Sequence, residues 1–337
     1  MKGVVATSLG SSWSLVDDLE RPKPDKHQVL VRSLVTGINP MDELMRTTDL
    51  LVKEWPVVLG CDASGEAVEV GEEVTKFKVG DGIFGCTRLG FKEYGTFQEF
   101  VGFLFLLDSH LMDEELAFKR PGNISVEEAA TVGVGLLTAA ICLAEGNHIS
   151  FPSSPANAGD DAEWFVVLGG TSSVGQYAIK IVLAAGADET FDYKLSEIRQ
   201  LNEIWSWTLG KFAGVFDVSA ANTNVGLNAF REFSTASRKT FSTTNDWDTI
   251  PTSPEESIEI YRVHLGELGR YGEVKGDEIN RAVKKYIPVL EDLLANGYLV
   301  PVEGEVAAVG FEQIRNGVEA LGKARSGKKV LVKLQEY

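Results

Sequence analysis

The feature that most constrains this chain is an apolar strand that runs at once into a glycine- and serine-rich loop and then an amphipathic helix. The segment WFVVLGGTSSVGQYAIKIVLAAG spans residues 164–186. In its second half, Ala178, Ile181 and Val182 recur at the spacing of one helix face. A buried strand joined to a helix in this way predicts the first half of a βαβ unit, and therefore a parallel sheet covered by helices.

The loop is a G-x-S-x-x-G variant of the glycine fingerprint that holds a dinucleotide diphosphate. Such a turn brings backbone N–H groups and the positive end of a helix dipole close to the anion. Because this turn follows an apolar strand and opens a helix, we predict diphosphate binding here, with a purely structural turn as the alternative. The predicted cofactor-binding residues are Gly170, Thr171, Ser172, Ser173, Val174 and Gly175.

The same fingerprint expects an acidic residue about 20 positions further on, where the second strand ends and the carboxylate holds the ribose. Asp192 stands at about that distance. The chain between is short, because the helix ends near Gly186 and ADETFDYK follows directly. Two alternatives remain: Asp192 ends a shortened second strand over about Thr190 to Tyr193, or a strand–helix unit is missing.

The regions on either side have patterns of their own. HQVLVRSLVTGI, within the first third, alternates as a half-buried strand does, and glycine-punctuated β-branched runs follow it. The segment from residue 124 to 146 reads as helical, with Ser125 as N-cap and Glu128 completing a capping box. Near the end, FEQIRNGVEALGKARSGKKVLVKL predicts a helix, a turn and a last strand.

Charge and cysteine content exclude several classes of protein. The 49 acidic and 32 basic residues give a net charge of −17, which disfavours binding to nucleic-acid backbones. Three cysteines are too few for a disulfide framework and suit a reducing compartment. No apolar run reaches the length of a membrane span, and no targeting signal is recognised. We expect a cytoplasmic protein that associates with neither nucleic acid nor membrane.

Six segments together carry a family resemblance. They are GINPMD (37–42), the glycine-rich stretch 57–85, EEAATVGVGLLTAA (127–140), VVLGGTSSVGQYAIK (166–180), ADETFDYK (187–194) and the closing SGKKVLVKL. The chain resembles the medium-chain dehydrogenase/reductase superfamily, in its zinc-independent quinone-oxidoreductase and enoyl-reductase branch. Within that branch it looks most like fungal trans-acting enoyl reductases.

The resemblance implies an α/β protein with two domains. A GroES-like β-rich catalytic domain is formed by residues 1–123 and completed by a C-terminal return over 276–337. A Rossmann-type domain with a doubly wound parallel sheet spans 124–275. The implied reaction is hydride transfer to the β-carbon of an enone or enoyl thioester, or to a quinone. NADPH is the donor that the branch implies.

Matching motif by motif, the resemblance also implies individual site residues. Asn39 matches a position at the nicotinamide and substrate end of the active site and is the catalytic candidate. Thr138 lies on the motif that contacts the nicotinamide carboxamide, unless it is only a helix-face residue. Tyr193 matches a tyrosine near the 2′-phosphate, where Lys194 would add positive charge; a half-buried strand aromatic is the alternative for Tyr193.

The chain departs from the zinc-dependent branch of the family. That branch has a cysteine near position 39 and a His-Glu pair after Gly60, where this chain has Asn39, Cys61 and Asp62. A tetrahedral zinc site needs four suitable ligands, so we expect no metal and interpret Cys61 as a small buried residue. The histidines match no ligand spacing and are expected at the surface or in loops: His27, His110, His148 and His264.

Three further departures bear on activity. Leu44 stands where many quinone reductases have a tyrosine, so the proton must come from water or another side chain. GFLFLLDSHLM, residues 102–112, is an insertion relative to the family, either a loop over the site or a retained segment of the gene. Roughly 20 or more residues, the size of a βα unit, are absent after Gly186.

Three functional readings follow. The first is an NADPH-dependent reductase of an enone, an enoyl thioester or a quinone. The second is a non-catalytic relative with an incomplete cofactor site that acts as a binding or scaffold protein. The third keeps catalysis but uses NADH, because a carboxylate such as Asp192 repels a 2′-phosphate. A carrier-bound substrate would make a polyketide synthase the partner, and the chain is expected to be a monomer or homodimer.

Overall fold

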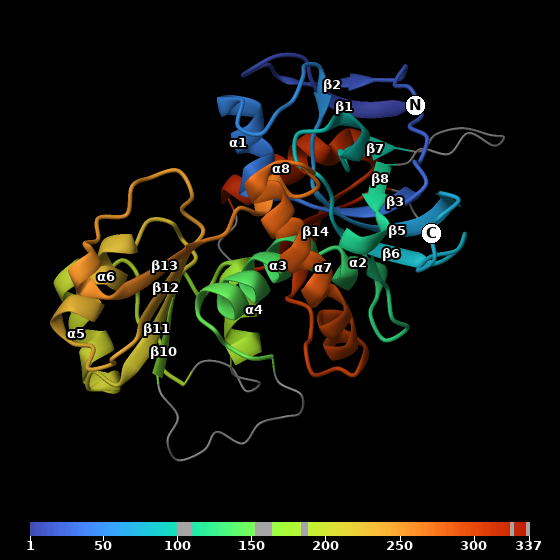
Figure 1. Cartoon of the computed structure of the whole chain (residues 1–337). Coiled ribbons are helices and arrows are strands. Elements are labelled where there is room, and N and C mark those ends of the chain that lie inside the picture. The colour runs from blue at the N-terminus through green and yellow to red at the C-terminus, as the bar shows by residue number, and fades with distance from the viewer. Residues whose placement is uncertain (100–109, 152–163, 183–187, 324–326, 335–337) are drawn as a thin grey trace. The chain divides into compact units, whose positions relative to one another are not determined.

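The structure, a computed structural model, describes residues 1–99, 110–151, 164–182, 188–323 and 327–334. The chain divides into two compact units (Figure 1). The first unit joins residues 1–134 to residues 265–337, and the second comprises residues 135–264. The first unit is therefore built from both ends of the chain, with the second inserted between them.

The first unit is dominated by β-structure. Its larger sheet is built, in the described residues, from β14 (Gly304–Val309), β15 (Lys329–Lys333), β3 (Gln28–Gly37), β5 (Asp62–Val70), β6 (Gly82–Cys86) and β9 (Phe118–Lys119) in that order, with β8 (His110–Asp113) also paired to β3. Its smaller sheet contains β1 (Lys2–Ala6), β2 (Trp13–Val16), β4 (Val57–Val58) and β7 (Gln98–Glu99).

The long strand β3 is the centre of the larger sheet. It pairs antiparallel with β5 over most of its length, with β8 near its start and with β15 at its end. Its apolar residues Val29 and Val31 are fully buried, and they pack in a core with Ile83 and Phe77. The alternating pattern in the sequence therefore predicted a strand correctly, but the expected half burial was wrong, because residues on both faces of β3 are buried. This strand lies between the C-terminal β15 and the N-terminal β5.

The end of the predicted insertion is part of this sheet. Residues 102–109 lie outside the described residues, but His110 to Asp113 form β8 against β3. The expectation of a surface or loop position was wrong for His110, whose side chain is fully buried. Its Nδ1 lies 2.7 Å from Ser33 Oγ, and burial lowers the pKa of His110 to about 3. The imidazole is therefore neutral, and only the pairing with β3 explains its position.

The first unit also contains helices. These are α1 (Pro40–Thr48), α2 (Val126–Ala129), α7 (Val274–Ala295) and α8 (Ile314–Lys323), with 3₁₀ turns at Lys92–Tyr94, Glu114–Leu116, Leu265–Glu267 and Phe311–Gln313. The predicted capping box is confirmed at α2. Ser125 Oγ accepts the Glu128 N–H at 3.1 Å, and Glu128 Oε2 accepts the Ser125 N–H at 2.8 Å.

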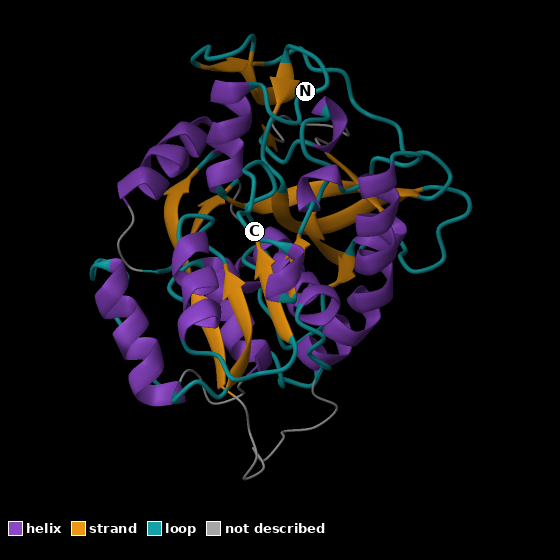
Figure 2. Cartoon of the chain, turned by 60° about the vertical axis from the view of Figure 1, so that its left-hand side comes forward, coloured by secondary structure: helices purple, strands orange, loops and turns teal. Residues whose placement is uncertain are grey.

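The second unit is a parallel sheet of the Rossmann type. Its strands, in spatial order, are β10 (Trp164–Leu168), β11 (Phe212–Asp217), β12 (Lys239–Thr243) and β13 (Ile258–Arg262). Its helices are α3 (Gly133–Ile141, which begins at the unit boundary), the π-helical turn Cys142–Gly146, α4 (Ser173–Val182), α5 (Glu197–Thr208) and α6 (Thr223–Glu232), with a 3₁₀ turn at Pro254–Glu256. Figure 2 shows these strands side by side, flanked by helices. The predicted strand–loop–helix over 164–182 is confirmed.

The sheet of the second unit lacks a strand on the outer side of β10 among the described residues. Residues 188–196 form turns and bends, so the predicted short strand over Thr190 to Tyr193 is wrong. Between α4 and α5 only residues 183–187 are not described. In the part of the chain that the structure describes, no strand or helix other than α4 and α5 occurs between β10 and β11. The described residues therefore agree with the other alternative, a missing strand–helix unit.

The amide of Asn147 ties the end of the π-helical turn to this sheet. Its Nδ2 donates to Val215 O at 3.3 Å and to Thr240 O at 3.1 Å, and the side chain is buried. Loss of a buried hydrogen-bonding group leaves its partners unsatisfied. We therefore expect Asn147→Ala to lower the free energy of unfolding by about 1–3 kcal/mol in urea denaturation. Asn202→Ala, at an exposed position on α5, is the control; an equal loss in both variants would contradict this role of Asn147.

Candidate functional site

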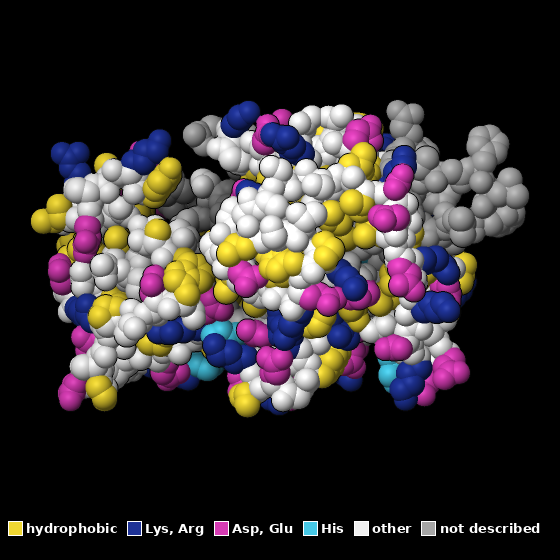
Figure 3. Space-filling model, turned by 90° about the horizontal axis from the view of Figure 1, so that it is seen from above, with side chains coloured by type: hydrophobic (Ala, Val, Ile, Leu, Met, Phe, Trp, Pro, Cys, Tyr) yellow, Lys and Arg dark blue, Asp and Glu magenta, His cyan; other side chains and the backbone are white. Residues whose placement is uncertain are grey.

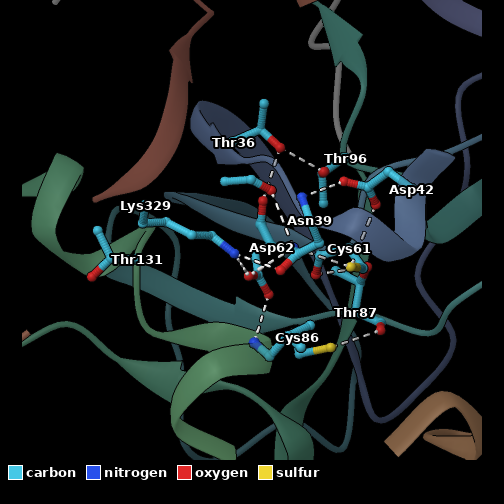
Figure 4. A network of polar contacts seen from close by, with 12 residues as sticks. Thr36, Asn39, Asp42, Cys61, Asp62, Cys86, Thr87, Thr96, Thr131 and Lys329 are labelled. Carbon is cyan, nitrogen blue, oxygen red and sulfur yellow. Dashed lines mark hydrogen bonds and ion pairs between the residues drawn. The ribbon is translucent and has the colours of Figure 1, made fainter. Parts of the chain in front are cut away.

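Asn39 lies where β3 ends and α1 begins. Pro40 occupies the first position of the helix, where its missing N–H costs nothing. The Asn39 backbone N–H donates to Asp42 Oδ2 at 2.8 Å, which fixes the chain at the entrance to the helix. The Asn39 side chain is buried rather than free at the surface. The catalytic candidate from the sequence thus belongs to a buried polar cluster of the first unit, drawn in Figure 4.

Both ends of the Asn39 amide are held by charged side chains. Lys329 Nζ donates to Asn39 Oδ1 at 2.5 Å, and Asn39 Nδ2 donates to Asp62 Oδ2 at 2.9 Å. A further contact joins Nδ2 to Gly37 O at 3.3 Å. Figure 4 shows the three side chains converging from separate elements. The amide is therefore held in one orientation by its neighbours.

The charged partners of Asn39 also form a buried ion pair with each other. Lys329 Nζ lies 2.8 Å from Asp62 Oδ2, with the side chains 4% and 0% exposed. The other carboxylate oxygen, Asp62 Oδ1, accepts the Val134 N–H at 2.7 Å. A buried ion pair is tolerated only when further hydrogen bonds satisfy its atoms. The Asn39 amide and the Val134 N–H supply those bonds here.

A second buried carboxyl group, Asp42, lies beside the Cys61 thiol. Cys61 Sγ is 3.6 Å from Asp42 Oδ1 and 3.5 Å from Asn39 Nδ2. Burial raises the pKa of Asp42 to about 7, against the opposing effect of the Asn39 N–H and of the Lys329 charge. The Cys86 thiol and burial raise the pKa of Cys61 well above its usual value. Cys61 is thus a buried, protonated thiol and not a reactive thiolate.

Threonines hold the backbone around these groups. Thr36 Oγ1 donates to Asp62 O at 2.8 Å and lies 2.7 Å from Thr96 Oγ1, while the Thr87 N–H donates to Cys61 O at 2.8 Å. Within the described residues, no group of three or more His, Cys, Asp or Glu side chains is arranged to hold a metal ion. What the cluster presents is an amide oriented between one ammonium and one carboxylate.

The predicted diphosphate loop lies in the second unit, between β10 and α4. Gly169 has φ +92°, a backbone conformation that favours glycine, so the chain can turn sharply out of the strand. A Cβ at Gly175 would overlap Gly169 O and lie 2.7 Å from Gly170 Cα. Only a residue without a side chain fits there, as in a dinucleotide fingerprint whose last glycine lets helix and strand pack closely.

The Ser172 side chain makes hydrogen bonds within the loop and stabilises its conformation. Ser172 Oγ donates to Gly169 O at 2.9 Å and accepts the Gly175 N–H at 3.1 Å. Thr171 and Ser172 are exposed, whereas the Ser173 hydroxyl is buried on the side of α3, where a Cβ at Gly135 would lie 2.6 Å from it. The two residues just before α4, Thr171 and Ser172, are thus the part of the loop that solvent or an anion can reach.

The other candidate cofactor residues lie elsewhere in the second unit. Thr138 is buried on α3. Tyr193 is 63% exposed in the turn before α5, and the Lys194 Nζ lies 5.8 Å from the centre of its ring. Asp192 Oδ1 accepts the Lys194 N–H at 2.9 Å, a local turn contact. No contact between these turn residues and the glycine loop occurs among the described interactions.

Sequence reasoning found Asn39 but missed its closest partners. Asp62 was considered only as a metal ligand, and Lys329 only as part of the closing SGKKVLVKL segment. Asp42 follows Asn39 by three positions, which is the spacing of a capping box, and this signal could have pointed to it. No sequence signal joins Lys329 to Asn39, because strand pairing across most of the chain brings them together.

On the face shown in Figure 3, Lys and Arg side chains lie among Asp and Glu side chains and form no continuous basic stripe. In the described part of the chain, every helix is too short or too polar to cross a bilayer.

Comparison with known proteins bears on both units. Residues 25–104 match the family model of the alcohol dehydrogenase GroES-like domain. The chain is 25% identical to a dehydrogenase of Monascus ruber, over 93% of this chain and 94% of that protein. It is 26% identical to a trans-enoyl reductase of Pyricularia oryzae, over 93% of each chain.

A solved structure shows the same fold. An alcohol dehydrogenase superfamily protein from Novosphingobium aromaticivorans superimposes with a TM-score of 0.76 at 21% identity. The match covers 99% of this chain and 100% of that one. The β-rich unit and the inserted parallel sheet therefore both have counterparts in one known fold.

The pKa of Asp42 predicts how stability depends on pH. Because the pKa of Asp42 is raised in the folded state, folding takes up a proton between about pH 4 and pH 7. The free energy of unfolding should therefore fall by a few kcal/mol as the pH rises through this range and level off above about pH 7. Denaturant titrations at several pH values measure this slope.

Two variants make the Asp42 measurement specific. Asp42→Asn keeps the shape and removes the titrating proton, so the fall in stability between about pH 4 and pH 7 should flatten. Asp18→Asn changes an exposed carboxylate and should keep the slope of the parent protein. If Asp42→Asn keeps the slope of the parent protein as well, Asp42 is ionised between about pH 4 and pH 7, and its pKa is not raised.

The glycine loop yields a second prediction. Gly175→Ala forces β10 and α4 apart, so we expect the affinity for a reduced nicotinamide dinucleotide to fall about tenfold or more. Titration of the cofactor fluorescence measures this. Gly322→Ala, on α8 where a Cβ meets nothing within 4 Å, is the control and should leave the affinity unchanged. Unchanged affinity in Gly175→Ala would count against diphosphate binding at this loop.

Proposed function

Because this chain belongs to the medium-chain dehydrogenase/reductase superfamily, we propose that it is an oxidoreductase that uses NADPH to reduce an activated double bond. The acceptor is an enone or an enoyl thioester, with a quinone as the related alternative. The trans-enoyl reductase of Pyricularia oryzae, similar over nearly the whole chain, supports the enoyl class. When bound, the reduced nicotinamide supplies the hydride.

The loop from Gly169 to Gly175 is the observation that carries this proposal. It leaves Thr171 and Ser172 exposed just before α4, and its last glycine has no room for a side chain. The backbone N–H groups at that helix start would hold the diphosphate. The protein offers less to the adenosine half of the cofactor. The described sheet ends at β10, so there is no neighbouring strand whose end could bind the ribose.

Asn39 is the residue proposed to contact the reacting end of the site. Its amide is oriented by Lys329 and Asp62, so it cannot turn to follow a moving ligand. Fixed dipoles that need no reorganisation are the form of stabilisation that favours charge development in a transition state. Leu44 provides no proton donor at the tyrosine position, and we therefore propose water as the source of the proton.

A non-catalytic binding or scaffold protein is the second candidate function. The missing strand–helix unit after α4 favours it, because the usual support of the adenosine ribose is absent from the described residues. The two candidates differ in a simple property: the reductase binds and oxidises NADPH, and the scaffold protein does neither.

The substrate class suggests a partner, and the cysteines suggest a compartment. An enoyl thioester on a carrier domain would make a polyketide synthase the partner, in keeping with the trans-enoyl reductase relative. We propose a cytoplasmic location, since Cys61, Cys86 and Cys142 are buried and unpaired, as suits a reducing compartment. A monomer or homodimer remains our proposal for the oligomeric state.

The central experiment follows NADPH with the purified full chain. We expect quenching or enhancement of NADPH fluorescence on binding, and oxidation of NADPH in the presence of 2-cyclohexenone as a simple enone.

Asn39→Ala should lower kcat about tenfold or more, because an oriented dipole at the reacting end is lost. NADH is compared in parallel, and we expect a lower KM for NADPH. A lower KM for NADH would instead favour the hypothesis that the enzyme uses NADH because Asp192 repels the 2′-phosphate of NADPH.

Asn296→Ala is the matched control, since this exposed amide at the end of α7 lies outside the cluster. It should retain the kcat of the parent protein. If the parent chain shows no binding at millimolar NADPH and no turnover, the reductase is excluded and the scaffold protein is the remaining candidate.

A further inference from the structure

Three side chains of the first unit form a closed ring of polar contacts. Lys329 Nζ reaches Asp62 Oδ2 at 2.8 Å and Asn39 Oδ1 at 2.5 Å, and Asn39 Nδ2 closes the ring on Asp62 Oδ2 at 2.9 Å. Each member contacts both others, and all three are at most 5% exposed. Figure 4 shows this ring at the centre of the cluster.

The chemistry of the ring allows only one orientation of the amide. An ammonium group only donates hydrogen bonds, and a carboxylate only accepts them. If the Asn39 amide were turned over, its NH₂ group would face the Lys329 ammonium and its oxygen would face the Asp62 carboxylate. Both contacts would be repulsive. The orientation thus follows from the charges of the two partners and does not depend on distinguishing nitrogen from oxygen in the amide.

The ammonium is brought to this place by strands from opposite ends of the chain. Lys329 is the first residue of β15, and its backbone N–H donates to Glu303 O at 2.9 Å. β15 pairs with the end of β3, two residues before Asn39. The Ile38 N–H donates to Val330 O at 2.9 Å, which locks the register between these strands. The distance from Lys329 to Asn39 is therefore set by backbone pairing.

Gly37 makes space for the lysine side chain. A Cβ at this position would lie 2.9 Å from Lys329 Cε, 2.6 Å from Ala130 O and 3.2 Å from Asp62 Cβ. The strand thus lacks a side chain at the place where the aliphatic part of Lys329 passes. The backbone of Ala130 is the nearest neighbour, and the aliphatic part of Lys329 packs against Gly37 beside it.

We propose that Lys329 is a positioning residue for Asn39, and that its ammonium fixes the amide in the orientation used at the reacting end of the site. Lys329 acts through Asn39 and does not itself contact the substrate. The proposal rests on the proposed function for its effect on turnover, but the orientation of the amide can be measured without it.

The test must separate positioning from stability. Lys329→Met alone leaves the Asp62 carboxylate buried without its cation, and this variant can fail to fold. The main variant is therefore the double replacement Lys329→Met with Asp62→Leu, which removes both charges and keeps the length of one side chain and the branched shape of the other. Lys328→Met is the matched control, because the neighbouring lysine is paired with Glu303 at the surface. Thermal unfolding checks that both variants are folded.

Turnover of 2-cyclohexenone with NADPH gives the first readout. We expect the double variant to lose about tenfold or more in kcat while its dissociation constant for NADPH stays within about threefold, because the glycine loop is unchanged. Adding Asn39→Ala to the double variant should cause no further loss, since the lysine acts through that amide. A folded double variant with the kcat of the parent, or a full additional loss with Asn39→Ala, overturns the proposal.

The second readout needs no activity. In protein labelled with ¹⁵N-asparagine, the Asn39 side-chain NH₂ signal is identified by its loss in Asn39→Ala. We expect its exchange with water to be about tenfold or more faster in the double variant than in the parent or in Lys328→Met. Equal exchange rates overturn the proposal. A parent chain that neither binds NADPH nor turns over excludes the proposed function, while the exchange rates still decide whether the Lys329–Asp62 pair fixes the Asn39 amide.

Discussion

The buried ion pair between Lys329 and Asp62 is the constraint on which the candidate site depends. It joins the last strand of the described chain to β5, and both of its charged groups are satisfied only because Asn39 and the Val134 N–H complete their hydrogen bonds. A buried charge without such partners would destabilise the fold strongly. Stability and the geometry of the site therefore rely on the same atoms, so that the residue proposed to meet the substrate is also one that the fold needs.

In the second unit, the glycine loop is intact, but the described sheet is smaller than a dinucleotide domain requires. Its glycine loop keeps the features that a diphosphate needs, from the left-handed turn at Gly169 to the absence of space for a side chain at Gly175. Yet its described sheet ends at β10, where a dinucleotide domain would continue with another strand. Binding energy would then come mainly from the diphosphate and the nicotinamide side, which makes cofactor affinity the property that decides between a reductase and a scaffold protein.

Much of the fold could be predicted because its signals are local. The strand–loop–helix over residues 164–182 and the capping box at Ser125 depend on residues close together in sequence, and both are confirmed. Chain length left two alternatives for the segment after Gly186, a shortened strand or a missing strand–helix unit, and the described residues agree with the second. Two errors were non-local. His110 is buried because β8 pairs with a strand about 80 residues away, and the described segment around Asp192 contains turns and no strand.

By itself the sequence determined the class of fold and the position of the glycine loop, since these depend on periodicity and on the conformational freedom of glycine, and matched motifs led to the proposal of Asn39 as a site residue. Only the tertiary structure decided what surrounds Asn39. Lys329 and Asp62 are 267 residues apart, and they meet because β15 and β5 pair with the same strand, β3. Pairing between distant strands is set by the energy of the whole sheet, so no local pattern in the chain records it.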